Sequence, residues 1–302
     1  MTTPRLRFIL GLFFGWAGAL YVASSPTLAW AADAKRGAYI YTAAGCQGCH
    51  TTPKDAKAKV LLAGGRALKT PFGTYYTPNI TPDPESGIGK WSEADFKRAL
   101  RDGKTPDGEN YFPVFPYTAY TKMSDADMED LWAYLTSVAP VRRANQPHDT
   151  KFIFGWRMMM WPWRVMNFKA GSMKADLGKG VSWNRGAYLV EALSHCGECH
   201  TPRDPLGGLK AEMHLAGTVD GPGGDPVPNI TPDKETGIGN WSEDDYESLF
   251  GLGMLPDGDF IGGEMTEVYE NTAKLSDTDR RAMTVYLRSL PAIQNRVSKA
   301  KP

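Results

Sequence analysis

The sequence predicts an all-α protein with long loops, built from two tandem copies of one domain behind a secretion signal. Three observations support this prediction: motifs recur at a spacing of 150 residues, helix-start signals recur with them, and strand signals are few. The chain has 302 residues, which is enough for two domains with a core each. Its 32 glycines and 22 prolines indicate much loop between short helices.

The first 31 residues have the order of a secretion signal. Arg5 and Arg7 precede an apolar run over 8–23, and Ala29-Trp30-Ala31 offers small residues for cleavage after Ala31. The alternative is an uncleaved anchor, although the run is shorter than the about 20 apolar residues that span a bilayer. Cleavage would leave 32 basic and 34 acidic residues, and no basic cluster indicates a nucleic-acid partner.

The internal repeat is defined by four matched motifs. Each pair is separated by 150 residues: CQGCH (46–50) with CGECH (196–200), PNITPD (78–83) with PNITPD (228–233), GIG (87–89) with GIG (237–239), and PDG (106–108) with PDG (256–258). Near the end of each copy the separation becomes 152, so the second copy carries two extra residues. We expect domains over 32–140 and 182–302, joined by a connector over 141–181.

Each copy predicts three main helices in the same order. A short helix carries Arg-Gly-Ala-Tyr, at 36–39 and 185–188, and runs into the cysteine motif. The other two each begin at a serine that can cap free backbone N–H groups, and the last of them has a capping-box-like start and continues through apolar residues at helical spacing. These serines are Ser92 and Ser124 in the first copy and Ser242 and Ser276 in the second.

The four cysteines lie in two Cys-x-x-Cys-His motifs. One helical turn brings the two thiols of a motif together, so they can add to the two vinyl groups of one haem, and the adjacent imidazole can bind the iron. A thioredoxin-type pair has no use for the histidine, and a zinc site would leave the long repeats unexplained. The sequence therefore predicts two covalently bound haem c groups, held by Cys46, Cys49, His50, Cys196, Cys199 and His200.

Three segments carry a resemblance to a known family. TPNITPDPESGIGKWSEADFKRALRDGKTPDG, WNRGAYLVEALSHCGECHTPRDPLGG and LSDTDRRAMTVYLRSL resemble the multihaem cytochrome c subunits of periplasmic alcohol, aldehyde and gluconate dehydrogenases. The resemblance covers nearly the whole mature chain, and those subunits often carry three haem domains where this chain has two motifs. It implies two tandem class I cytochrome c domains and electron transfer from a partner dehydrogenase toward the respiratory chain.

The sixth iron ligand is expected from the loop before the last helix of each copy, where class I cytochromes c supply a methionine. In the second copy this residue is Met265, seven positions after Gly258. Seven positions after Gly108 stands Phe115, which cannot bind iron. Three alternatives stay open for haem 1. They are Met123, an open or water-bound iron, and a ligand from outside the domain such as His148.

Two further features have two interpretations each. The connector segment over 152–171 holds three of the nine tryptophans and four of the twelve methionines. It is either a buried strap between the domains or an exposed surface that docks a dehydrogenase or touches the membrane interface. Asn79 and Asn229 either make their turns or donate to haem propionates.

We expect a periplasmic dihaem electron carrier, with inner-membrane association as an option and no catalytic residue of its own. Its donor would be a dehydrogenase, and its acceptor a cytochrome, a quinone or an oxidase. The alternative is a dihaem enzyme of the peroxidase or thiosulfate dehydrogenase type with an open haem 1. A peroxidase would need a polar acid–base group near that iron, whereas the sequence around Phe115 offers Pro, Val, Tyr and Thr, with only Glu109 nearby.

Overall fold

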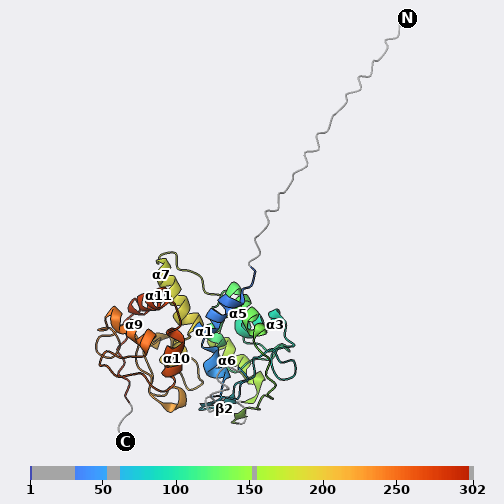
Figure 1. Cartoon of the computed structure of the whole chain (residues 1–302), viewed down its shortest axis with the longest axis horizontal. Coiled ribbons are helices and arrows are strands. Elements are labelled where there is room, and N and C mark those ends of the chain that lie inside the picture. Colours follow the sequence, from blue (N-terminus) through green and yellow to red (C-terminus); the bar gives the residue numbers. More distant parts are fainter. Residues whose placement is uncertain (2–30, 53–61, 152–154, 299–302) are drawn as a thin grey trace. The chain divides into compact units, whose positions relative to one another are not determined.

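The computed structural model describes residues 1, 31–52, 62–151 and 155–298. Residues 32–302 form one compact unit (Figure 1). The predicted secretion signal lies almost wholly outside the described residues. In the described part, no helix has the length and apolar character needed to cross a bilayer.

The structure is mostly helical, and its elements follow the repeat. We call 32–140 repeat 1, 141–181 the connector and 182–302 repeat 2. Repeat 1 contains α1 (Ala34–Ala43), α2 (Cys46–His50), β1 (Ala67–Thr70), β2 (Gly73–Tyr76), α3 (Glu93–Asp102), α4 (Tyr117–Tyr120) and α5 (Asp125–Ser137). The connector contains β3 (Asp149–Thr150), the 3₁₀ turn η3 (Arg157–Met159) and α6 (Met160–Asn167). Repeat 2 contains α7 (Val181–Tyr188), the π-helical turn η4 (Leu189–Leu193), α8 (Gly197–His200), the 3₁₀ turns η5 (Ala211–Met213) and η6 (Pro222–Gly224), α9 (Glu243–Leu252), α10 (Met265–Thr272) and α11 (Asp277–Arg288).

The first and last helices of each repeat cross at a glycine. A Cβ atom on Gly37 would lie 1.9 Å from the Asp130 carbonyl oxygen of α5, and one on Gly186 would lie 1.9 Å from the Ala282 carbonyl oxygen of α11. Only glycine lets the two backbones approach this closely. The close crossing explains the glycine of the repeated Arg-Gly-Ala-Tyr motif.

The predicted serine caps are confirmed. Ser92 and Ser242 form capping boxes with Asp95 and Asp245 at the starts of α3 and α9. The side chains of Ser124 and Ser276 accept the backbone N–H groups of the residues three positions on, at the starts of α5 and α11. Local sequence therefore fixes where these four helices begin.

A small antiparallel sheet departs from the all-α expectation. β1 and β2 form a hairpin, and the connector strand β3 pairs with β2 through Gly73 and Thr74. Gly73 has φ 133°, and a Cβ there would lie 2.5 Å from the Asp149 carbonyl oxygen. The hairpin segment is short, and its third strand is distant in sequence, so local patterning did not reveal it. The sheet ties the connector to repeat 1.

The two-residue difference between the repeats falls in the loop that was expected to carry the sixth ligand. The backbone N–H of Tyr111 donates to the Gly103 carbonyl, and that of Ile261 donates to the Gly253 carbonyl, so the separation of 150 still holds there. The Tyr117 ring packs on Gly103, and the Tyr269 ring packs on Gly253. These two tyrosines therefore occupy equivalent positions, although they are 152 residues apart. The extra residues lie between Ile261 and Tyr269. α10 accordingly has eight residues where α4 has four.

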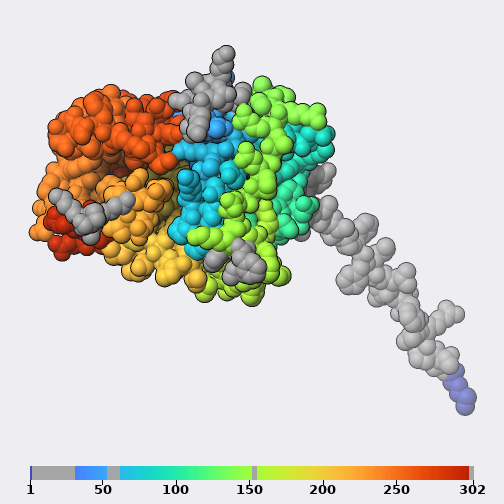
Figure 2. Space-filling model, turned by 90° about the horizontal axis from the view of Figure 1, so that it is seen from below, coloured from blue at the N-terminus to red at the C-terminus, as the bar shows by residue number. Residues whose placement is uncertain are grey.

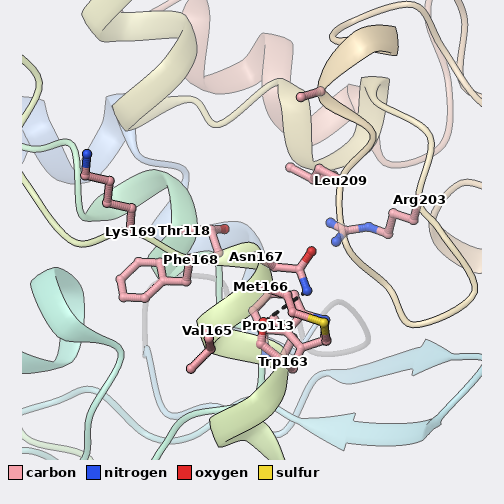
Figure 3. A pocket seen from close by; sticks show the side chains of 11 residues that line it. Pro113, Thr118, Trp163, Val165, Met166, Asn167, Phe168, Lys169, Arg203 and Leu209 are labelled. Atoms are coloured by element: carbon pink, nitrogen blue, oxygen red, sulfur yellow. Dashed lines mark hydrogen bonds between the residues drawn. The ribbon is translucent and has the colours of Figure 1, made fainter.

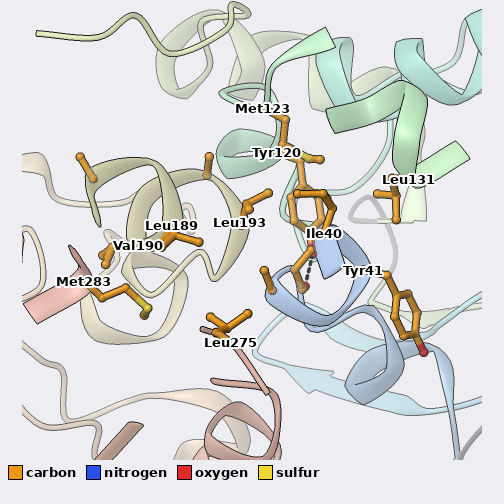
Figure 4. Packing of buried hydrophobic residues seen from close by; sticks show 14 of the residues in the cluster. Ile40, Tyr41, Tyr120, Met123, Leu131, Leu189, Val190, Leu193, Leu275 and Met283 are labelled. Atoms are coloured by element: carbon orange, nitrogen blue, oxygen red, sulfur yellow. Dashed lines mark hydrogen bonds between the residues drawn. The ribbon is translucent and has the colours of Figure 1, made fainter. Parts of the chain in front are cut away.

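The two repeats share one apolar core. The cluster includes Ile40, Met123 and Leu131 of repeat 1 and Leu193 and Met283 of repeat 2 (Figure 4). In the space-filling view the blue-to-green residues of repeat 1 and the yellow-to-red residues of repeat 2 lie in contact (Figure 2). Continuous burial of apolar surface across the contact favours a fixed arrangement of the two repeats.

Two candidate haem-attachment sites

Each cysteine motif occupies a tight helical turn. In repeat 1 the turn α2 is preceded by Gly45 in the left-handed conformation (φ 62°), and in repeat 2 His195 takes that conformation (φ 41°) before Cys196. All four cysteines of the chain are described, and none is paired in a disulfide. The sulfurs are therefore available to a bound group.

The thiols do not have the chemistry of a redox-active pair. Burial raises the pKa of the Cys46 and Cys196 thiols to about 12 and that of the Cys199 thiol to about 11. Burial also raises the pKa of the Cys49 thiol. Redox-active Cys-x-x-Cys pairs have lowered thiol pKa values, because the thiolate is the nucleophile. Burial that raises the thiol pKa argues against the thioredoxin alternative.

The two motif histidines are oriented in the same way. His50 Nδ1 lies 2.8 Å from the Pro78 carbonyl oxygen, and His200 Nδ1 lies 2.8 Å from the Pro228 carbonyl oxygen. A carbonyl can only accept, so Nδ1 carries the proton and Nε2 keeps its lone pair in the neutral ring. Burial lowers the pKa of both imidazoles, which favours that neutral form. An Nε2 lone pair fixed by a backbone acceptor fits an iron ligand.

The Pro-Asn-Ile-Thr turns hold these acceptor carbonyls. Asn79 Oδ1 accepts the backbone N–H of Thr81 at 2.9 Å, and Asn79 Nδ2 donates to the Val141 carbonyl at 2.7 Å. Asn229 makes the same two contacts, with Thr231 at 2.9 Å and the Ile293 carbonyl at 2.7 Å. Both asparagines are 2% exposed. Their bonds support the turn-making interpretation, with the amide also fastening the segment after the last helix.

The expected sixth-ligand positions differ between the repeats. Met265 is partly exposed and is the first residue of α10. Phe115 lies instead in an aromatic cluster, with ring centroids 5.3 Å from Tyr111, 6.3 Å from Tyr117 and 5.9 Å from Tyr120. Phe115 thus packs as an aromatic core residue at this position.

Met123 has the environment of a core residue. Its side chain is 0% exposed, and its counterpart Leu275 is 3% exposed. Both belong to the apolar core shared by the repeats (Figure 4). The same packing position is therefore filled by methionine in one repeat and by leucine in the other, which supports a packing role for Met123.

His148 is held in the opposite sense to the motif histidines. Its Nδ1 accepts the backbone N–H of Tyr76 at 3.2 Å, and its ring packs against Tyr75 and Phe112. An accepting Nδ1 places the proton of the neutral ring on Nε2, which then has no lone pair for iron. His214 Nε2 is bonded to Glu191 at 2.7 Å, and the His195 ring packs on Tyr120.

In each repeat we call the turn that holds the Cys-x-x-Cys-His motif the attachment turn, and the segment between the Pro-Asp-Gly motif and the last helix the distal loop. The attachment turn of each repeat lies beside the distal loop of the other repeat. Arg66 donates to the Gly48 carbonyl inside the first motif and to Glu267 of α10. In the other direction, the Thr118 hydroxyl of α4 donates to Glu198 inside the second motif. Sequence reasoning did not identify Arg66, Thr118 or Glu198, because their partners lie in the other repeat.

A cleft of about 400 Å³ lies beside the Thr118–Glu198 contact (Figure 3). Repeat 1 contributes Pro113 and Thr118, and repeat 2 contributes Arg203, which bonds Glu198. The connector lines it along α6 and the residues after that helix. The cleft thus brings together the distal loop of repeat 1 and a neighbour of the second attachment turn.

The connector combines both expected characters. Trp163 is 7% exposed, and its Nε1–H donates to the Leu206 carbonyl at 3.0 Å, as a strap would require. Other large apolar side chains face outward. We call these the connector patch, which comprises Trp156 (52% exposed), Met158 (75%), Trp161 (66%), Val165 (66%) and Met166 (64%).

Comparisons with known proteins agree with this geometry. Residues 34–139 match the family model "Cytochrome c". The chain is 43% identical over 267 residues to a protein of Cereibacter sphaeroides named diheme cytochrome c-type, covering 87% of each chain. It is 37% identical to the fructose dehydrogenase cytochrome subunit of Gluconobacter japonicus, covering 89% of this chain and 54% of that subunit. It is 38% identical to the gluconate 2-dehydrogenase cytochrome c subunit of Pantoea cypripedii, covering 85% of this chain and 59% of that subunit.

The chain thus spans more than half the length of these dehydrogenase subunits and most of the dihaem protein. The oriented histidines, the unpaired cysteines and the similarity lead to one assignment. The chain belongs to the c-type cytochrome family that includes dihaem cytochromes and the cytochrome subunits of dehydrogenase complexes, and it carries two covalently bound haem c groups.

Proposed function

We propose that this protein is a periplasmic electron carrier that accepts electrons from a dehydrogenase and passes them toward the respiratory chain. The observation that carries the proposal is the matched pair of histidines, His50 and His200. Each donates Nδ1–H to a proline carbonyl at 2.8 Å and keeps Nε2 for iron. Two of the relatives are named as cytochrome subunits of dehydrogenases, which favours an electron carrier over a dihaem enzyme.

The proposed organisation is two tandem class I cytochrome c domains over 32–140 and 182–302. The bound haems would supply reversible one-electron chemistry through iron, and the protein's own residues would attach them, orient their histidines and exclude water. Cys46 and Cys49 would hold haem 1, and Cys196 and Cys199 would hold haem 2. Export behind the cleaved N-terminal segment would place both in the compartment where covalent haem attachment occurs.

The proposed ligation is unequal. Met265 would be the sixth ligand of haem 2, where a neutral thioether raises the potential and closes the iron. Two assignments remain for haem 1, Met123 and an open or water-bound iron. Burial of Met123 in the shared core, at a position filled by Leu275 in repeat 2, supports the second assignment, and we adopt it. The open iron should have the lower potential of the two.

The proposed donor site is the connector patch. Val165 and Met166 belong both to the patch and to the cleft beside the Thr118–Glu198 contact. A partner seated on the patch would therefore lie next to the distal loop of repeat 1 and the attachment turn of repeat 2. Proximity to both haem sites favours a redox partner here over a lipid surface. A cytochrome, a quinone or an oxidase would accept the electrons elsewhere on the protein.

The proposal is tested with a Trp161→Ser, Val165→Ser double variant. Reduction by the periplasmic dehydrogenases of the cells that produce the protein should slow at least about tenfold, because apolar anchors carry most of the energy of such contacts. Leu252→Ser is the control, since Leu252 is 61% exposed and lies in α9. Unchanged reduction by dehydrogenase would contradict the docking assignment. Loss of binding to protein-free anionic vesicles would indicate that the patch contacts lipid instead.

A further inference from the structure

Arg66 joins structures that belong to different haem sites. Its guanidinium donates to the Gly48 carbonyl, which lies inside the first Cys-x-x-Cys-His turn. The same group pairs with Glu267 at 2.6 Å and with Glu264 at 2.5 Å, both in repeat 2. These two glutamates flank Met265, the proposed sixth ligand of haem 2. The Arg66 side chain is 11% exposed, whereas Glu267 is 38% and Glu264 is 63% exposed, so water screens the pair with Glu267 less than the pair with Glu264.

The backbone of Arg66 is itself fixed on the histidine side of haem site 1. Its N–H donates to the Thr77 hydroxyl at 3.1 Å, and its carbonyl accepts the Thr77 N–H at 3.0 Å. Thr77 directly precedes Pro78, whose carbonyl orients His50. The backbone of Arg66 is therefore held in place by repeat 1. Because the backbone is held, the guanidinium can fix the positions of Glu264 and Glu267.

The packing around this contact is close. A Cβ atom on Gly48 would lie 2.6 Å from Glu267 Oε2, so a side chain at position 48 would displace the carboxylate. Helix α10, which begins at Met265, also contacts α1 of repeat 1. The start of α10 thus rests on the attachment turn of haem 1.

We infer that Arg66 is a positioning residue for haem 2, holding the loop that carries Met265 against the attachment turn of haem 1. The inference rests on the proposed role of Met265 as sixth ligand. It makes methionine binding in repeat 2 depend on an intact repeat 1. In the opposite direction, Arg203 donates to the Glu198 carbonyl inside the second motif at 3.1 Å and pairs with the Glu198 carboxylate, and Thr118 of repeat 1 donates to that carboxylate.

The test measures how readily the loop releases its methionine. Ferric holoprotein is titrated with imidazole, and the far-red charge-transfer band of methionine-bound ferric haem is followed, since only haem 2 should show it. In Arg66→Gln the band should disappear at about tenfold lower imidazole concentration, because charge-assisted hydrogen bonds are lost. The imidazole midpoint of Arg66→Lys should lie between those of the wild type and Arg66→Gln, because lysine keeps the positive charge but cannot donate several hydrogen bonds in the guanidinium geometry. The methyl resonance of the bound methionine in the ferrous protein gives a second readout.

Arg280→Gln is the matched control. Arg280 is also 11% exposed and also pairs with two acidic residues at 2.6 Å, Glu247 and Asp277, but it lies in α11 and links that helix to α9 within repeat 2. Arg280→Gln should lower the thermal stability of the protein without changing the imidazole concentration at which the band disappears. Glu267→Gln should shift the midpoint in the same direction as Arg66→Gln and serves if the Arg66 variants fail to fold.

Two results separate this inference from the ligand assignment. A band that persists in Met265→Leu would refute Met265 as ligand, and with it the proposed ligation. A band that is lost in Met265→Leu but titrates normally in Arg66→Gln and Glu267→Gln would overturn the role of Arg66 alone.

Discussion

The Tyr39 hydroxyl, on the first helix of repeat 1, donates a 2.6 Å hydrogen bond to Asp279 on the last helix of repeat 2. Tyr188 repeats the contact with the roles of the repeats exchanged, donating to Asp127 of α5 at 2.5 Å. Each tyrosine oxygen also accepts the backbone N–H of the serine that caps the partner helix, Ser276 or Ser124. The repeats are thus joined by two equivalent contacts at helix starts.

Replacing Tyr39 by phenylalanine should lower the free energy of unfolding by about 1–2 kcal/mol. The change leaves the buried Asp279 carboxylate without one donor, and hydrogen bonds to charged acceptors are the costly ones to lose. Tyr188→Phe should cost a similar amount, because its contact is equivalent. Denaturant unfolding of the holoprotein measures both. Tyr246→Phe is the control, since its hydroxyl donates to a neutral carbonyl within repeat 2 at 3.3 Å. If all three variants lowered the free energy of unfolding equally, the hydrogen bonds between the repeats would contribute no more to stability than one within a repeat.

Acid should weaken the contact between the repeats through Glu191. This carboxylate accepts from Lys122 of repeat 1 at 2.9 Å and from His214 at 2.7 Å. Burial alone would raise its pKa, but the bonds to His214 and Lys122 outweigh burial and lower the pKa to about 2. The depressed value means that Glu191 stabilises the fold above the pKa of the unfolded chain, about 4.3. That contribution is lost as pH falls from there toward about 2.

A Glu191→Gln variant tests this pH dependence. Above about pH 5 the variant should be less stable than the wild type by about 3 kcal/mol, because it lacks the carboxylate whose pKa folding lowers. The difference should shrink as pH falls toward about 2. Unfolding curves collected across this range give the comparison, and a difference that stays constant with pH would rule out the ionised carboxylate as its source.

The helix crossings should be intolerant of a single methyl group. Gly37→Ala and Gly186→Ala each place a Cβ 1.9 Å from a carbonyl oxygen of the partner helix, so the helices must separate. Overpacking of this kind costs about 1–3 kcal/mol. Gly180→Ala is the control, because a Cβ there meets nothing within 4 Å. In thermal unfolding, the melting temperatures of Gly37→Ala and Gly186→Ala should lie well below that of Gly180→Ala. A wild-type melting temperature for either crossing variant would contradict the close approach.

Features set by local sequence were predictable. The cysteine motifs, the histidines that follow them and the serine caps each depend on a few adjacent residues, and the internal repeat made every signal visible twice. The caps at Ser92 and Ser242 are an example, since each serine accepts the backbone N–H of the residue three positions along the chain. The sequence predicts a capping-box-like start at Ser124 and Ser276, where the structure has the serine cap. The full capping boxes are at Ser92 and Ser242.

Features set by the contact between the repeats were not predictable from local patterns. Tyr39 and Asp279 are 240 residues apart, and Arg66 and Glu267 are 201 apart, so no short window holds both members. The recurrence of Tyr39 as Tyr188 was a usable signal, because both tyrosines stand at the same place in the repeated motif. Arg66 had no such signal, since only one repeat carries it.

The most direct test of unequal ligation is the number of carbon monoxide molecules bound by the fully reduced protein. An open iron in repeat 1 and a methionine-bound iron in repeat 2 predict one molecule per two haems, with Met123→Leu unchanged and Met265→Leu binding two. A redox titration should then resolve two transitions, the lower belonging to the haem that binds carbon monoxide. Absence of carbon monoxide binding in the wild type, together with its appearance in Met123→Leu, would contradict the account and identify Met123 as the sixth ligand of haem 1.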